Sequence, residues 1–110
     1  MSEERRRYQR HDVRVAALCR RVSEHGIEPA AHGETTDLSL GGFGAVLDEY
    51  FEMGDVVDVD LVLVPHLVTL RALVVDVSPA GDRVRIHCIY TDPPPMVARA
   101  IDDFLSARNA

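Results

Sequence analysis

Two short stretches of the chain carry the side chains with the most specific chemistry. In the first, near the N-terminus, five of the twelve basic residues fall within ten positions: Arg5, Arg6, Arg7, Arg10 and Arg14. An arginine guanidinium can bind phosphate oxygens bidentately, donate to the O6 and N7 acceptors of guanine, or stack on the base. In the second, residues 37–42, Asp37 can accept from guanine N–H donors, which arginine cannot do.

The second stretch reads Asp-Leu-Ser-Leu-Gly-Gly and adds two further features. Ser39 supplies a small hydroxyl, and Gly41 and Gly42 leave backbone N–H groups that an anion can approach. Phosphate donors, donors for one purine edge and an acceptor for the opposite edge together describe a guanine nucleotide site.

The distribution of charge agrees with a small anionic ligand. The chain has a formal net charge of -6. All of its basic residues are arginines, so the position of the arginine cluster says more about the ligand than the use of arginine in place of lysine. Binding to nucleic acid normally requires a basic face. We therefore expect no nucleic-acid partner.

Catalysis and metal binding find little support. No serine lies in a Gly-x-Ser-x-Gly context, the five histidines lack paired-ligand spacing, and the acidic residues of 48–60 lack the spacing of a calcium loop. Cys19 and Cys88 are predicted to be small buried hydrophobic residues. We expect no enzyme, no bound metal and no cofactor.

Length and hydropathy predict one soluble domain. The 110 residues suit a single core, 46% of them are hydrophobic, and no apolar run approaches the ~20 residues that span a bilayer. The charged N-terminus is not followed by the apolar stretch of a secretory signal. We expect a cytoplasmic protein without a membrane partner.

Hydrophobic periodicity predicts the elements that must position these residues. Residues 1–12 have no apolar face, which predicts a flexible arm that orders only with ligand. Pro29 and Gly33 indicate that the second strand is irregular or at an edge. Residues 37–42 are predicted to form a loop and 78–82 a hairpin turn. Apolar alternation predicts strands at 13–20, 27–36, 43–47, 57–63, 67–77 and 84–90.

After three consecutive prolines at 93–95, the period becomes helical from Met96, with an apolar stripe that includes Ile101 and Leu105. Six strands followed by one amphipathic helix predict a mainly β fold, a six-stranded antiparallel β-barrel with a C-terminal α-helix on its surface or mouth. Within the single domain 1–110, we expect the arm at 1–12, the barrel at 13–92 and the helix at 93–110.

The two stretches resemble a known pair of motifs. Residues 6–10 fit Arg-x3-Arg, and residues 37–42 fit Asp-x-Ser-x2-Gly. In this order the motifs are similar to those of the PilZ domain family, whose members are six-stranded barrels that bind the bacterial second messenger cyclic di-GMP. The resemblance implies a non-catalytic receptor for cyclic di-GMP that signals to a downstream protein, not identified by the sequence.

By this resemblance the ligand contacts are Arg6 and Arg10, with Arg5 or Arg7 as an auxiliary contact, and Asp37, Ser39, Gly41 and Gly42 in the second motif. Residues 10–14 also fit Arg-x3-Arg, but Arg14 belongs to the strand alternation and is less free to close over a ligand. Tyr8 suits either stacking on a base or packing the arm on the barrel.

Two other functions remain open from the sequence. One is a barrel that docks a protein and binds no nucleotide. The other is a single-stranded nucleic-acid barrel, which requires aromatic residues on a basic sheet face. The chain has 5% aromatic residues and no tryptophan, and its clearest strand is acidic, which argues against the second.

Overall fold

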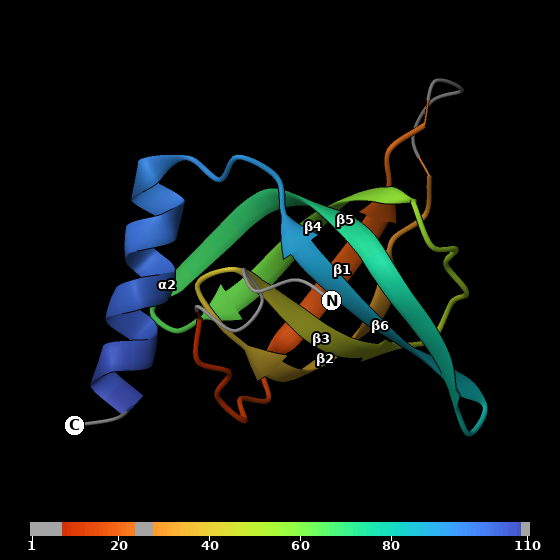
Figure 1. Ribbon diagram of the computed structural model, residues 1–110, viewed down its shortest axis with the longest axis horizontal. Helices are drawn as coiled ribbons and strands as arrows, with labels where there is room; N and C mark the ends of the chain where they lie inside the picture. Colours follow the sequence, from red (N-terminus) through yellow and green to blue (C-terminus); the bar gives the residue numbers. More distant parts are fainter. Residues whose placement is uncertain (1–7, 24–27, 109–110) are drawn as a thin grey trace.

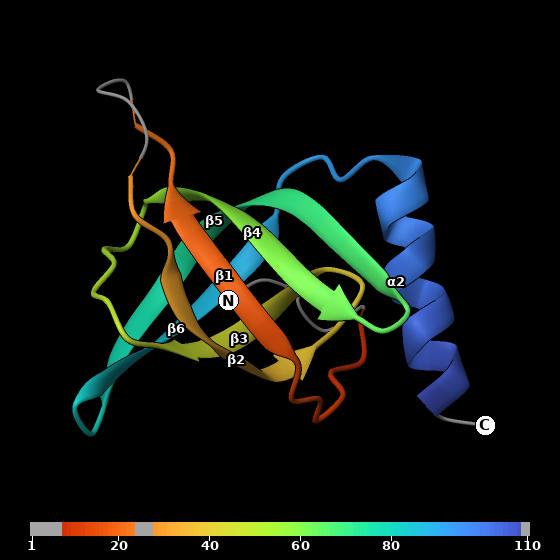
Figure 2. The same ribbon diagram turned by 180° about the vertical axis from the view of Figure 1, so that it is seen from behind.

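The computed structural model describes residues 8–23 and 28–108 and confirms the predicted fold class. Its strands form a closed antiparallel barrel in the order β1-β2-β3-β6-β5-β4 (Figures 1 and 2). The elements are β1 (Ala16–Arg21), β2 (Ala31–Leu38), β3 (Gly42–Leu47), β4 (Val56–Leu63), β5 (His66–Ala80), β6 (Arg83–Tyr90) and the helix α2 (Pro95–Arg108).

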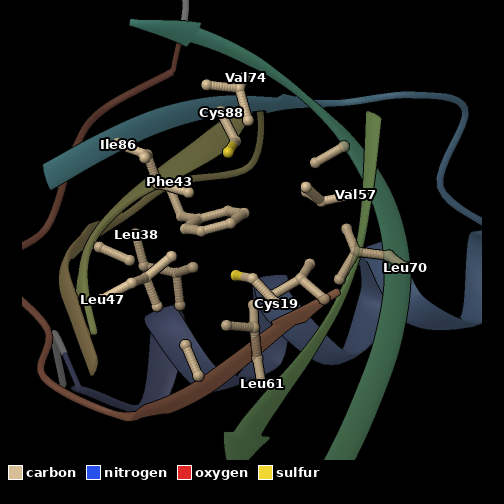
Figure 3. Packing of buried hydrophobic residues seen from close by; sticks show 14 of the residues in the cluster. Cys19, Leu38, Phe43, Leu47, Val57, Leu61, Leu70, Val74, Ile86 and Cys88 are labelled. Carbon is tan, nitrogen blue, oxygen red and sulfur yellow. The ribbon is translucent and has the colours of Figure 1, made fainter. Parts of the chain in front are cut away.

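The barrel interior is filled by alternate apolar residues of every strand, as the two-residue period of a half-buried strand requires. In β4, for example, Val57, Val59 and Leu61 are fully buried. Figure 3 shows Cys19 and Cys88 pointing into this interior near the Phe43 ring. Both cysteines are buried and free, which confirms their prediction as small core residues.

The prediction that the second strand is irregular or at an edge is wrong about the edge, because β2 pairs with β1 on one side and β3 on the other. Pro29 lies before the strand, where it interrupts no ladder. A Cβ atom at Gly33 would lie 1.9 Å from the carbonyl oxygen of Val46. Gly33 therefore marks a close approach of two backbones inside the sheet.

The first strand begins at Ala16 and not at Val13, although Val13 is buried as the alternation predicts. The buried Thr35 explains the difference, because its hydroxyl takes the place of backbone partners. The hydroxyl donates to the carbonyl oxygen of Val13 and accepts from the backbone N–H of Val15 at 3.0 Å. Residues 13–15 are thus attached to β2 by the Thr35 hydroxyl and by one backbone hydrogen bond, from the Thr35 N–H to the carbonyl oxygen of Val15 at 2.9 Å.

Two loops are shorter than predicted. β2 extends through Leu38, so Asp37 lies on a strand and the turn that follows begins at Ser39. β5 extends through Ala80, which pairs with Arg83, so the hairpin turn predicted at 78–82 is reduced to Gly81 and Asp82. Gly81 has a φ of 68°, a conformation that glycine adopts without strain.

The C-terminal helix lies across one end of the barrel, where β4 turns into β5 (Figures 1 and 2). Its apolar stripe buries Ile101 and Leu105 and contacts β4 and β5. This agrees with the predicted packing on the surface or mouth of the barrel. Among the described residues, no helix is both long enough and apolar enough to cross a membrane.

Candidate functional site

The N-terminal segment joins the barrel beside the second motif. His11 and Leu38 exchange two backbone hydrogen bonds, with N···O distances of 3.0 and 2.9 Å. This pairing brings Tyr8 and Arg10 to the end of β2. The two segments enclose a pocket of about 600 Å³, lined by Tyr8, Arg10, Asp37, Ser39, Leu40, Gly41, Gly42, Phe43, Val75, His87, Cys88, Ile89, Tyr90 and Pro93.

Ser39 builds the turn between β2 and β3. Its Oγ accepts from the backbone N–H groups of Gly41 and Gly42, each at 3.1 Å, and donates to the carbonyl oxygen of Gly42 at 3.1 Å. Ser39 is only 6% exposed. The two N–H groups that the sequence suggested for an anion are therefore already used within the turn, and the serine hydroxyl holds the backbone of the motif in place.

The two glycines of the motif are needed for different close contacts. A Cβ atom at Gly42 would lie 2.1 Å from the carbonyl oxygen of Cys88, because β3 and β6 approach each other closely there. A Cβ atom at Gly41 would lie 2.5 Å from the Tyr8 ring. Of the two roles left open for Tyr8, the structure shows packing against the barrel, where Tyr8 lines the pocket and is 39% exposed.

Asp37 faces the pocket from β2, after a register shift between Thr35 and Asp37. Its Oδ2 accepts from the Thr36 hydroxyl at 3.2 Å. Opposite it on β3 lies Gly44, which has no side chain to occupy this part of the surface. The Asp37 carboxylate is thus accessible to a ligand and is oriented by its neighbours.

Tyr90 is a residue of the pocket that the sequence did not single out. Its hydroxyl donates to the carbonyl oxygen of Ser39 at 3.1 Å, and its backbone N–H donates to the carbonyl oxygen of Gly41 at 3.1 Å. Its ring stacks on Phe43 with a centroid separation of 6.2 Å. Burial, followed by the Cys88 and Asp37 charges, raises the pKa of Tyr90, so the phenol stays protonated and donates. The apolar alternation of β6 predicted that Tyr90 lies on a strand, but it did not predict the hydrogen bond to Ser39 or the contact with Phe43.

The described arginines of the first stretch lie in different places. Arg10 is exposed and lines the pocket, and it takes part in none of the ion pairs formed among residues 8–23 and 28–108. Arg14 lies outside the pocket and pairs with Glu34 at 3.4 Å. The predicted contacts Arg5, Arg6 and Arg7 lie outside the described residues.

Metal-binding side chains do not gather in the described part of the chain: no group of three or more His, Cys, Asp or Glu residues there is placed to hold an ion. Among the described residues, the pocket combines the Arg10 guanidinium, the Asp37 carboxylate, the His87 imidazole, a turn held by hydrogen bonds and an apolar wall. Such a set suits recognition of an anionic ligand that also has N–H donors.

Comparison with solved structures shows where this fold occurs. The Escherichia coli YcgR PilZ domain with c-di-GMP is similar with a TM-score of 0.71 and 19% identity, over 96% of this chain and 92% of that one. Escherichia coli YcgR in complex with c-di-GMP is similar with a TM-score of 0.76 and 20% identity, over 96% of this chain and 46% of that one. The Bacillus subtilis inhibitor of motility MotI is similar with a TM-score of 0.74 and 18% identity, over 96% of this chain and 51% of that one.

The chain thus spans about half the length of MotI and of YcgR. No curated protein shows significant similarity to it by sequence. The sequence model of the PilZ domain matches residues 4–107, which covers both motifs, the whole barrel and almost all of α2. The chain belongs to the PilZ domain family.

Proposed function

We propose that this protein is a non-catalytic receptor that binds cyclic di-GMP in the pocket between the N-terminal segment and the Ser39 turn. The observation that carries the proposal is that Arg10 and Asp37, which belong to separate motifs, line the same pocket. Membership of the PilZ family and the similarity to the YcgR PilZ domain with c-di-GMP support it.

The residues divide the work of binding by their chemistry. Arg6 and Arg10 contact the phosphates and the acceptor edge of guanine, and Arg5 or Arg7 adds an auxiliary contact. Asp37 accepts from the guanine N–H donors. Ser39, Gly41 and Gly42 keep the turn in the shape that presents this carboxylate, since their hydrogen bonds lie within the turn.

The arm turns ligand binding into a signal. Charge-assisted hydrogen bonds to the arginines offset the entropy lost when the arm, which Tyr8 and His11 already join to the barrel, closes over the ligand. The closed arm and the filled pocket together form a surface that the empty protein lacks. A downstream protein that recognises this surface receives the signal.

Titration calorimetry with cyclic di-GMP tests the proposal through a matched pair of variants. Arg10→Ala is expected to weaken binding at least about tenfold, because a charge-assisted bond contributes ~1.5–3 kcal/mol and ~1.4 kcal/mol is a factor of ten. Arg6→Ala is expected to do the same. Arg14→Ala is the control, since this exposed arginine lies outside the pocket, and it should leave the affinity unchanged.

The outcomes separate the proposal from its rivals. If the folded wild-type protein gives no binding heat with cyclic di-GMP, the receptor function is wrong and a protein-docking barrel takes its place. If Arg14→Ala weakens binding and Arg6→Ala does not, the first motif is instead formed by Arg10 and Arg14.

A further inference from the structure

A row of side chains crosses the outer surface of the barrel at the pocket. The strand register places Asp37 opposite Gly44, Gly44 opposite His87, and His87 opposite Asp76. Directly opposite residues of neighbouring strands lie on the same face of a sheet. The row faces outward because the neighbours of His87 on β6, Ile86 and Cys88, are buried in the core.

In the middle of this row Gly44 has no side chain, and side chains from the neighbouring strands close over it. A Cβ atom there would lie 2.6 Å from Asp37 Oδ2, 2.9 Å from Thr36 Oγ1 and 3.1 Å from His87 Cε1. The carboxylate and the imidazole ring thus approach one another across the glycine, although they come from β2 and β6. Both residues line the pocket.

Charged side chains from several elements face His87. Asp37 faces it across β3, Asp76 lies opposite it on β5, and Arg85 is the next outward residue on its own strand. Arg10 lines the same pocket from the N-terminal segment. A carboxylate close to an imidazole stabilises the imidazolium, and histidine gains its proton close to physiological pH. A phosphate brought into this pocket adds further negative charge.

We propose that His87 is a further ligand-binding residue, whose imidazolium contacts bound cyclic di-GMP beside the Asp37 carboxylate and makes the affinity rise as the pH falls. The inference rests on the proposed receptor function. It assigns to β6 a contact that lies outside both motifs. The direction of this pH dependence follows from linkage, because a ligand that binds the protonated protein more tightly has a higher affinity at a pH where the protonated form is populated.

The test measures the affinity for cyclic di-GMP by calorimetry at about pH 6 and about pH 8, on either side of the ordinary histidine titration. Wild-type protein should bind more tightly at the lower pH. His87→Gln keeps an N–H donor but cannot become charged, so it should lose at least about tenfold in affinity at the lower pH and approach the wild type at the higher. His66→Gln is the control, because His66 is exposed and lies outside the pocket.

A second measurement covers the case in which His87→Gln does not fold, as judged by circular dichroism. In the wild-type protein, the imidazole proton resonances of His87 should shift as cyclic di-GMP is added, with the same saturation as the calorimetric curve. Those of His66 should stay in place.

Each result has a distinct meaning. A His87→Gln variant with the same pH profile as the wild type, even at uniformly lower affinity, overturns the inference, because a structural role alone would produce it. So does the absence of a His87 shift in a wild-type protein that binds. A wild-type protein that does not bind at either pH overturns the receptor function itself.

Discussion

Ser39 and Tyr90 hold the turn between β2 and β3 from its two sides. The serine hydroxyl bonds to the backbone of the two following glycines, while the tyrosine hydroxyl donates to the serine carbonyl oxygen. Tyr90 lies far from the turn in the sequence, so this bond couples the turn to the end of β6. At the scale of single residues, the shape of the motif thus depends on a side chain outside it.

Tyr90→Phe tests this coupling. The variant keeps the ring that stacks on Phe43 but leaves the Ser39 carbonyl oxygen without its donor. The free energy of unfolding should fall by about 1 kcal/mol, and cyclic di-GMP should bind several-fold more weakly because the turn is less rigid. Urea unfolding and calorimetry measure the two effects. Tyr50→Phe, at a residue that is 65% exposed, is the control, and equal losses in both variants would contradict the coupling.

At the scale of elements, β3 combines two glycines with different neighbours. Around Gly42 the close atoms belong to the backbone of β6, at Cys88. Around Gly44 they belong to side chains of the pocket, among them Asp37 and His87. One glycine therefore lets the barrel close, and the other leaves room for the two pocket side chains that we propose as ligand contacts.

This difference predicts opposite effects of the same substitution. Gly42→Ala should lower the free energy of unfolding strongly, by about 1–3 kcal/mol or more, because the backbone of β6 must move. Gly44→Ala should fold with a smaller loss, because side chains can move aside, yet bind cyclic di-GMP at least about tenfold more weakly as Asp37 is displaced. Thermal unfolding and calorimetry on both variants compare them. A Gly44→Ala protein that binds normally would show that the space above Gly44 has no part in binding.

At the scale of the whole molecule, the closed barrel keeps two thiols away from water. Burial, with a smaller effect of the Asp60 charge, raises the pKa of Cys19 from 9.0 to about 12. Burial likewise raises the pKa of Cys88, with a smaller effect of Cys19. In the unfolded chain both thiols ionise at their ordinary pKa of 9.0. The folded protein therefore retains protons that the unfolded chain loses.

The sign of the resulting pH dependence follows. The thiols have no effect on stability below the ordinary pKa, because both states are protonated there. As the pH rises from 9.0 toward 12, each ionised thiol of the unfolded chain lowers the free energy of unfolding by about 1.4 kcal/mol per pH unit. Urea unfolding under reducing conditions, in steps above the ordinary thiol pKa, measures this slope. The double variant Cys19→Ala, Cys88→Ala should have a shallower slope, and identical slopes would rule the thiols out as its source.

Much of the fold follows from local patterns. The alternation of Val57, Val59 and Leu61 predicts a strand in any context, and the prolines at 93–95 separate the last strand from the helix for steric reasons. Each motif is also local, and the prediction that Arg10 and Asp37 share one site came from their complementary chemistry and from the resemblance of the pair to the PilZ motifs; both residues line one pocket. The predicted strand position and strand start were wrong where a tertiary contact overrides the local pattern. At Gly33 this contact is a close approach of two backbones inside the sheet, and at Thr35 it is the hydroxyl that bonds to residues 13–15.

The sequence by itself therefore determined that the chain is a barrel with a helix, and it predicted that an arginine arm and the 37–42 segment form one site. Only the tertiary structure decided that Ser39 holds the turn, that side chains close over Gly44, and that Tyr90 and His87 line the same pocket as Asp37. The physical reason is that the register between neighbouring strands sets which side chains meet. Whether a β6 side chain reaches a β2 residue depends on how three strands align across a closed barrel, and no local pattern in the chain contains that alignment.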